Sequence, residues 1–169
     1  MLARAMASSN DNFYHATIFS TEADTIAFAG RIARLLRQGD TITLAGGLGV
    51  GKTVFARALV RAFLPREEVP SPTFTLVQSY ETTAFAMAHV DLYRVKERSE
   101  FRELGLDEAL DGGVLVIEWP DRMGELLPYD RLDIILSPGE AEGARAAQII
   151  ARGSWAARIR AMFERDTRA

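Results

Sequence analysis

The sequence contains no cysteine and very few histidines and asparagines. Without cysteine the chain has no disulfide framework, no thiolate chemistry and no cysteine-ligated zinc. Two histidines in 169 residues argue against a histidine metal site. The only asparagines are Asn10 and Asn12, so the Asn-Lys-x-Asp motif with which regulatory GTPases read guanine is absent. Oxygen ligands and backbone groups are therefore the chemistry to look for.

Long apolar runs are also absent. No run approaches the ~20 residues needed to cross a bilayer, and residues 1–12 lack the apolar centre of a secretory signal. We therefore expect a cytoplasmic protein without membrane contact, whose residues 1–12 form a disordered leader. At 48% hydrophobic and 25% charged, residues 1–169 have the composition of a single globular domain. The net charge of -3 argues against a protein that grips nucleic acid over its whole surface.

Residues 41–55 combine an apolar strand, a glycine-rich loop and the start of an amphipathic helix. Their pattern contains G-x-x-x-x-G-K-T, the spacing of a phosphate-binding loop. Glycines let bare N–H groups approach phosphate oxygens, and a helix N-terminus favours an anion. Lys52 can reach the β- and γ-phosphates, and the Thr53 hydroxyl can hold Mg²⁺. We expect ATP or ADP in preference to guanine nucleotides, bound by Gly46, Gly47, Leu48, Gly49, Val50, Gly51, Lys52, Thr53 and Val54.

Two predicted strands end in a carboxylate. Asp91 follows Met-Ala-His-Val, and Glu118 follows the wholly apolar Val-Leu-Val-Ile. In parallel sheets ligands bind beyond the carboxyl ends of the strands, where a carboxylate can hold Mg²⁺ or polarise the water that attacks a γ-phosphate. Asp91, Glu118 and Lys52 are therefore the candidate catalytic residues, and Thr53 and Glu118 the candidate metal ligands. A structural ion pair or a helix cap is the alternative for each acid.

Three further features stay open on the sequence alone. The segment Ser-Pro-Thr-Phe-Thr either folds over the γ-phosphate as a switch, through Ser71 or Thr73, or makes a turn with a buried Phe74. His89 fits a core residue better than a catalyst. Arg94 either stabilises transferred phosphate charge or pairs with an acid.

Hydrophobic periodicity predicts strands and helices that alternate around the phosphate loop. The first helix should begin with a capping box between Thr21 and Asp24. The pattern indicates a three-layer α/β fold of the P-loop nucleoside-triphosphatase type, with a mainly parallel central sheet and antiparallel edge strands. The predicted strands are 16–19, 41–45, 74–80, 85–91, 114–117, 132–136 and 146–151, and the predicted helices are 21–37, 54–64, 99–110 and 155–163.

Four motifs follow one another along the chain. They are Gly-Gly-Leu-Gly-Val-Gly-Lys-Thr, ending at Thr53, Ser-Pro-Thr-Phe-Thr-Leu-Val, ending at Val77, His-Val-Asp-Leu-Tyr-Arg, ending at Arg94, and Val-Ile-Glu-Trp-Pro, ending at Pro120. Together they resemble the TsaE (YjeE) family of bacterial ATPases. Many families share the phosphate loop, but the other three motifs rarely follow it in this order. The resemblance extends from about residue 21 to residue 136.

The resemblance implies an ATPase needed to make threonylcarbamoyladenosine, the modified base beside the anticodon of tRNAs that read ANN codons. The family acts with TsaD, which carries out the carbamoyl transfer, and TsaB, its pseudo-enzyme relative, and meets tRNA only through that complex. By matching positions, Thr53 and Glu118 would bind Mg²⁺ and Asp91 would serve hydrolysis. Lys52 and the loop amides would bind the phosphates.

The resemblance also implies two contacts outside the loop, since residues 21–25 would lie near the adenine and Arg145 would approach the nucleotide. One position departs from the family, because the loop usually has Asp where this chain has Gly47. Two alternatives stay open. A small-molecule kinase shares the fold but needs an arginine-rich lid, for which Arg98 and Arg102 lie among too many acids. A nucleotide-gated binding subunit, slow alone and faster with its partners, also fits.

Overall fold

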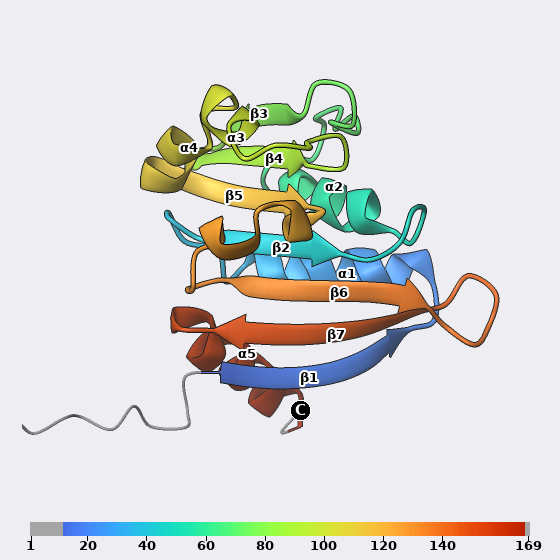
Figure 1. Cartoon of the computed structure of the whole chain (residues 1–169). Coiled ribbons are helices and arrows are strands. Elements are labelled where there is room, and N and C mark those ends of the chain that lie inside the picture. The colour runs from blue at the N-terminus through green and yellow to red at the C-terminus, as the bar shows by residue number, and fades with distance from the viewer. Residues whose placement is uncertain (1–11, 168–169) are drawn as a thin grey trace, which may run out of the picture.

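The computed structural model describes residues 12–167 (Figure 1). Their strands are β1 (Asn12–Phe19), β2 (Thr41–Ala45), β3 (Val77–Glu81), β4 (Ala86–Asp91), β5 (Gly113–Glu118), β6 (Leu132–Pro138) and β7 (Arg145–Arg152). The helices are α1 (Glu22–Ala33), α2 (Lys52–Phe63), α3 (Glu100–Glu103), α4 (Leu106–Gly112) and α5 (Ser154–Asp166), with short 3-10 helices η1 (Pro120–Arg122) and η2 (Gly124–Leu126). Among these residues no helix is long and apolar enough to cross a membrane.

All seven strands form one sheet, in the order β1-β7-β6-β2-β5-β4-β3. The central strands β6, β2, β5 and β4 are parallel. At the edges β7 pairs antiparallel with β6 and with β1, and β3 pairs antiparallel with β4. A mainly parallel centre with antiparallel edges confirms the predicted fold class. Because the central strands run the same way, their carboxyl ends lie along one edge of the sheet.

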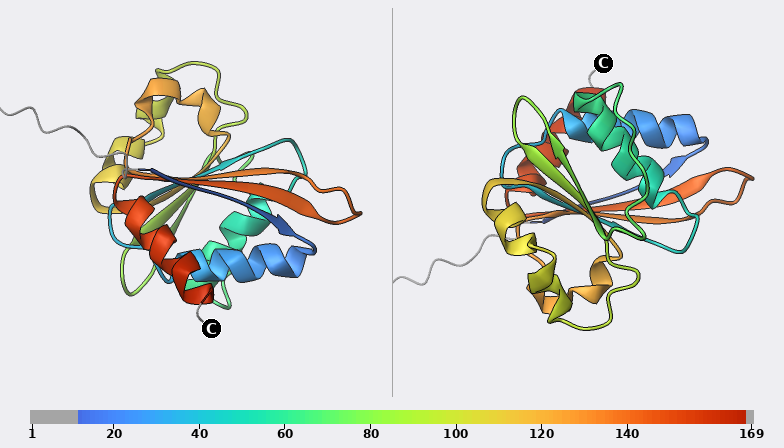
Figure 2. Two further views of the ribbon diagram at one scale, coloured as in Figure 1. Left: turned by 90° about the horizontal axis from the view of Figure 1, so that it is seen from below. Right: turned by 90° about the horizontal axis from the view of Figure 1, so that it is seen from above.

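Helices cover both faces of the sheet, which makes three layers (Figure 2). Helices α1, α2 and α5 pack on one face, and α3 and α4 pack on the other. Strand β5 shows the division. Val114 and Val116 belong to the larger core beneath the three long helices, whereas Leu115 and Ile117 belong to the smaller core beneath α3 and α4. Burial on both faces explains why this strand reads as a continuous apolar run.

The first helix begins as predicted. Thr21 is the N-cap of α1: its hydroxyl accepts from the Asp24 amide, and the Asp24 carboxylate accepts from the Thr21 amide. The capping box is therefore present. The helix ends at Ala33 rather than at residue 37, because the Leu35 amide donates to the carbonyl three residues back, in a 3-10 turn.

Two predicted elements are wrong in the middle of the chain. The helix expected over residues 99–110 is divided into α3 and α4, because Gly105 adopts a left-handed conformation between them (φ 66°). The strand expected from residue 74 begins only at Val77, after Leu76 also turns left-handed (φ 65°). A left-handed leucine is unusual, and sequence patterns give no sign of it.

The first strand is longer than predicted. It begins at Asn12 instead of residue 16, and Phe13 and His15 pack against Phe163 of α5, with ring centroids 6.0 and 3.9 Å apart. A local pattern does not register this contact between the two ends of the chain. The expected leader therefore does not include Asn12, and residues 1–11 lie outside the described residues.

A buried ion pair joins α5 to the start of β2. Arg158 donates to both carboxylate oxygens of Asp40 at 2.7 Å and to the Leu35 carbonyl at 2.8 Å. Its guanidinium also lies 3.9 Å from the centre of the Trp155 ring. The Arg158 and Asp40 side chains are only 8% and 9% exposed. Such a pair offsets its desolvation cost only when it is well hydrogen-bonded, which is the case here.

Candidate functional site

The glycine-rich loop connects the end of β2 to the start of α2, at the carboxyl edge of the parallel strands (Figure 1). Two glycines are required by geometry. Gly46 has a φ of 137°, and a Cβ there would lie 2.3 Å from the Leu136 carbonyl oxygen, while Gly51 has a φ of 111° just before α2. The Val50 side chain is buried in the larger core. The loop is therefore anchored to the sheet and to the core.

Helix α2 begins at Lys52 without a side-chain cap, in contrast to the capping box of α1. No described side chain therefore accepts from its first amides, and the helix dipole adds partial positive charge at the same place. Leu48, at the tip of the loop, is 72% exposed. An uncapped helix start behind a glycine-rich loop is an anion-binding arrangement.

Lys52 is turned back onto its own loop. Its ammonium donates to the carbonyl oxygens of Gly46 and Gly47 at 2.7 Å each and lies 4.0 Å from the centre of the Trp119 ring. The residue is 4% exposed. Burial lowers the pKa of the Lys52 ammonium from its ordinary value, and the negative charges of Glu118 and Asp91 oppose that shift. The loop lysine is therefore held close to both strand-end acids.

Glu118 ends β5 beside the end of β2. Its Oε2 accepts a hydrogen bond from the Thr53 hydroxyl at 3.2 Å, and its Oε1 accepts one from His89 Nε2 at 2.8 Å. Glu118 and His89 are 2% and 0% exposed. The contact needs a hydrogen on His89 Nε2, and His89 Nδ1 has no partner among the described residues. The histidine therefore holds Glu118 in one direction, toward Thr53.

Asp91 ends β4 and lies opposite Glu118 in the parallel register. Its Oδ2 accepts from the Thr73 hydroxyl at 3.0 Å, and its Oδ1 accepts from the Tyr93 amide at 2.9 Å. The hydroxyl-rich loop therefore reaches the second acid. Phe74 in the same loop is 79% exposed, so the alternative of a turn around a buried Phe74 is wrong.

The loop, the start of α2 and the two acids surround a cavity of about 210 Å³. Among the side chains that the structure describes, no group of three from His, Cys, Asp or Glu could hold a metal. The oxygens that meet are the Thr53 hydroxyl and the Glu118 carboxylate, and Mg²⁺ typically binds a few protein oxygens plus phosphates and water. The donor set therefore fits Mg²⁺. The lining residues are Leu48, Gly49, Gly51, Lys52, Thr53, Val54, Thr73, Asp91, Glu118 and Trp119.

Three other positions singled out from the sequence do not line this cavity. Arg145, at the start of β7, donates from Nε to the Val50 carbonyl at 2.6 Å and so contacts the loop. A Cβ at Gly47 would meet nothing within 4 Å, so the acid usual in the family has room there. Arg94 forms no ion pair with a described acid, so that alternative is wrong. Its guanidinium lies 4.5 Å from the centre of the Phe74 ring instead.

Sequence reasoning missed two side chains of the site. Trp119 adopts a left-handed conformation (φ 60°), and its ring lies against Lys52 and, at 4.9 Å between centroids, against Tyr93. His89 is a core residue by burial, as expected, but it also binds Glu118. Position could have revealed both, since His89 shares a strand face with Asp91 two residues on, and Trp119 directly follows an acid.

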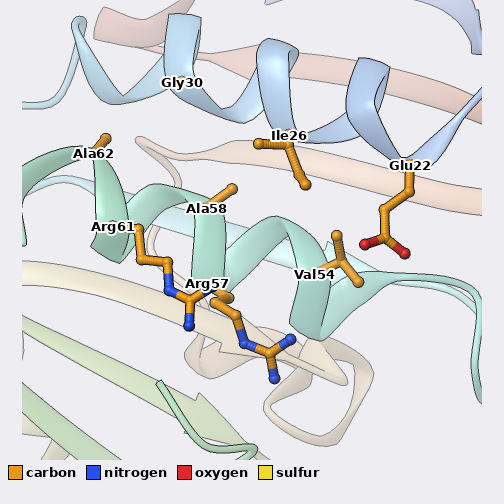
Figure 3. Close-up of a pocket in the computed structure, with 8 residues that line it drawn as sticks. All are labelled: Glu22, Ile26, Gly30, Val54, Arg57, Ala58, Arg61 and Ala62. Carbon is orange, nitrogen blue, oxygen red and sulfur yellow. The ribbon is translucent and has the colours of Figure 1, made fainter. Parts of the chain in front are cut away.

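A second hollow, of about 320 Å³, lies between α1 and α2 (Figure 3). Glu22 and Val54 lie near each other at its end beside the phosphate loop, and Ile26, 46% exposed, lies further along. Arg57 and Arg61 point away from α1, and their Nε atoms donate to carbonyls of the loop after α2 at 3.0 and 3.4 Å. Because Val54 also lines the phosphate-loop cavity, the two hollows adjoin.

The sheet order and the loop at its carboxyl edge place the chain in the class of P-loop nucleoside-triphosphatase folds. The family model "Threonylcarbamoyl adenosine biosynthesis protein TsaE" matches residues 19–147. The chain belongs to the TsaE family, as its four motifs predicted.

Individual relatives agree. The chain is 41% identical over 121 residues to the tRNA threonylcarbamoyladenosine biosynthesis protein TsaE of Rickettsia bellii, covering 71% of this chain and 84% of the relative. It is 39% identical over 114 residues to the protein of that name in Bacillus subtilis, covering 67% and 71%. The crystal structure of Bacillus subtilis YdiB matches 92% of this chain and 97% of YdiB, with a TM-score of 0.75 at 25% identity.

Proposed function

We propose that this chain is the ATP-binding, Mg²⁺-dependent ATPase subunit of tRNA threonylcarbamoyladenosine biosynthesis. The observation that carries the proposal is the cavity at which the phosphate loop meets two strand-end carboxylates, lined by Lys52, Thr53, Asp91 and Glu118. Relatives named for this biosynthesis support the pathway. TsaD and TsaB homologues are the proposed partners, in the cytoplasm. With a net charge of -3, the chain would meet tRNA through the complex rather than alone.

Each residue has one task in this proposal. The amides of the loop and the Lys52 ammonium bind the phosphates. The Thr53 hydroxyl and the Glu118 carboxylate hold Mg²⁺, which when bound neutralises charge on the transferred phosphoryl group. Asp91 orients the water for attack on the terminal phosphate. Because Asp91 Oδ2 accepts from the Thr73 hydroxyl, an ordered hydroxyl-rich loop and a positioned Asp91 go together.

The base of the nucleotide is assigned to the hollow between α1 and α2 (Figure 3). Residues 21–25 begin α1, and Glu22 in that segment lines the hollow together with Val54, which directly follows Thr53. A nucleotide held by the loop could extend into this hollow. The guanidinium of Arg145 is assigned to the loop side, where it already contacts the Val50 carbonyl.

A small-molecule kinase is disfavoured. Arg98 and Arg102, the candidates for a lid, line a different hollow of about 520 Å³ together with Phe101, Leu106 and Met123. Neither arginine lines the phosphate-loop cavity. Among the described residues, then, no arginine-rich lid covers the loop.

A nucleotide state that is read by another protein is favoured by exposed apolar side chains around the cavity. Leu48 and Phe74 are 72% and 79% exposed, and Tyr93 is 40% exposed. Exposed apolar side chains on and beside residues that line a polar site are typical of a protein contact. We therefore propose that hydrolysis is slow alone and faster with the partners, which would order the Ser71–Thr75 loop.

The test is steady-state phosphate release from ATP and Mg²⁺, by the isolated chain and by the chain mixed with TsaD and TsaB homologues from the same organism. We expect stimulation on mixing, and greater thermal stabilisation by ATP than by GTP. Fast turnover alone with no change on mixing would instead favour a free-standing kinase or hydrolase. Equal stabilisation by GTP would contradict the assignment of an adenine nucleotide.

A further inference from the structure

Strand β1 is the outermost strand on its side of the sheet, so its outer N–H and C=O groups have no strand partner among the described residues. Natural sheet edges are usually short, or carry charged residues or proline that prevent pairing with another chain. The opposite edge, β3, has five residues and ends in the exposed Glu81. In contrast, β1 has eight residues, Asn-Phe-Tyr-His-Ala-Thr-Ile-Phe, with no Asp, Glu, Lys, Arg or Pro.

One face of β1 is also open. Phe13 and His15 pack against Phe163 of α5, but Tyr14 and Ile18, on the other face, are 60% and 64% exposed. The smaller core beneath α3 and α4 contains side chains of β4 and β5 and none of β1 or β7. Figure 1 looks onto this face and shows described helices in front of the upper strands only. An unprotected edge and an exposed apolar face therefore coincide on one strand.

We propose that β1 is the docking edge for a second copy of this chain, paired antiparallel about a two-fold axis. Identical edge strands related by such an axis are antiparallel, so the contact closes on itself and no open edge remains at β1. In the register that places Ala16 opposite Ala16 of the second copy, Tyr14 lies opposite Ile18. An aromatic side chain opposite a β-branched one is a favourable cross-strand pair.

Electrostatic repulsion between the two β1 strands does not oppose this pairing. Two copies of β1 bring no like charges together in the strand itself, because it contains no Asp, Glu, Lys or Arg. A single strand pair is a small interface, so we expect monomer and dimer to exchange with concentration. The surface is separate from the proposed nucleotide site, since no residue of β1 lines the phosphate-loop cavity or the hollow between α1 and α2.

A disulfide tests the register. The chain has no cysteine, so Ala16→Cys introduces a single thiol, and directly opposite residues have Cβ atoms about 4.5–5.5 Å apart, close to the span of a disulfide. The control is Gln148→Cys, the neighbour of Ala16 on β7, whose two copies would be separated by three strand spacings, about 14 Å. Under mild oxidation in native buffer we expect covalent dimer from Ala16→Cys alone. Equal dimer from both variants, or none from Ala16→Cys, would overturn the proposal.

Sedimentation velocity of the full chain over a hundredfold range of concentration tests the association itself. We expect a dimer that forms with concentration, is lost in Ile18→Lys and persists in Leu126→Lys, whose position is likewise exposed but lies on η2. A chain that stays monomeric at every concentration would overturn the proposal. So would equal loss of dimer in both variants, or a dimer seen only after removal of residues 1–11, which would assign the edge to that segment.

Discussion

Buried carboxylates lie near both ends of β2, but their hydrogen-bond donors differ. At the start, Asp40 is bound by two guanidinium nitrogens of Arg158 at 2.7 Å, and also accepts from the Arg37 amide. At the end, Glu118 and Asp91 accept from a histidine, two hydroxyls and an amide. No arginine or lysine among residues 12–167 forms an ion pair with either of them.

The donors around each carboxylate therefore distinguish a residue that stabilises the fold from one that is available for nucleotide chemistry. When both oxygens of a carboxylate accept hydrogen bonds from one guanidinium, they are occupied by a contact that stabilises the fold. A carboxylate held mostly by neutral donors keeps oxygen lone pairs for a metal or for water. Changes at the start of β2 should therefore affect stability, and changes at its end should affect nucleotide chemistry.

The largest effect is expected from Asp40→Ala, because it leaves the Arg158 guanidinium buried without its partner. Breaking such a pair typically costs about 3–5 kcal/mol of unfolding free energy. The control is Asp166→Ala: this side chain pairs with Arg31 but is 49% exposed, and an exposed pair contributes about 0–1 kcal/mol. Urea unfolding measures both. Equal losses in the two variants would remove the distinction between the ends of β2.

At the other end of β2, Lys52→Ala should weaken ATP binding about a hundredfold, or ~2.8 kcal/mol. It should lower the urea midpoint less than Asp40→Ala does, although the Gly46 and Gly47 carbonyls lose their donor. The side chain belongs to neither hydrophobic core, so its removal creates no core cavity. Lys96→Ala is the control, because Lys96 is the only other lysine and is exposed. Calorimetric titration measures the ATP affinity of both variants, and unaltered binding by Lys52→Ala would contradict the phosphate-loop assignment.

The two acids at this end should differ from each other. Glu118→Gln should weaken Mg²⁺-dependent binding and hydrolysis together, by about tenfold or ~1.4 kcal/mol. Asp91→Asn should keep nucleotide binding and lose turnover by a similar factor. Phosphate release in the complete system and titrations with and without Mg²⁺ separate the two outcomes, with the exposed Glu125→Gln as control. Normal hydrolysis in both variants would mean that these carboxylates are structural too.

The smallest effect is expected from the histidine behind Glu118. His89→Leu removes the donor to Oε1, so the Mg²⁺ concentration at half-maximal hydrolysis should rise a few-fold, by roughly 1 kcal/mol, the net contribution of one hydrogen bond. His89→Gln supplies an amide donor and should recover part of that loss. His15→Gln is the matched control, since it changes the only other histidine, far from the acids. An unchanged Mg²⁺ dependence in His89→Leu would show that His89 only fills the core.

Most of the candidate site at the carboxyl edge of the sheet could be predicted from the sequence. Each motif is local, and each lies at the end of a strand that the fold brings to this edge. The loop, Asp91 and Glu118 are each readable from adjacent residues. The contact of His89 with Glu118 joins residues 29 apart and needs the register of β4 on β5. The left-handed turns at Leu76 and Trp119 are set by tertiary packing and contradict the usual preferences of those residues.

Errors elsewhere have similar physical origins. Gly105 interrupts a helical pattern that its neighbours would have continued, and a single glycine is often tolerated within a helix. The beginning of β1 depends on Phe163, at the other end of the chain. The Arg94 guanidinium contacts the Phe74 ring instead of an acid. For β1 and Arg94 local propensity was read correctly and a distant contact decided the outcome, whereas at Gly105 the left-handed conformation of the glycine itself ended the helix.

Lys52 donates hydrogen bonds to the Gly46 and Gly47 carbonyls, so these carbonyls compete with a nucleotide phosphate for the Lys52 ammonium. Phosphate oxygens gain this ammonium only in the fraction of molecules in which it has left the two carbonyls and the Trp119 ring. The apparent dissociation constant of a nucleotide is then the intrinsic constant divided by that fraction. Any contact that draws Trp119 away from Lys52 increases the fraction, and so strengthens nucleotide binding without touching the nucleotide.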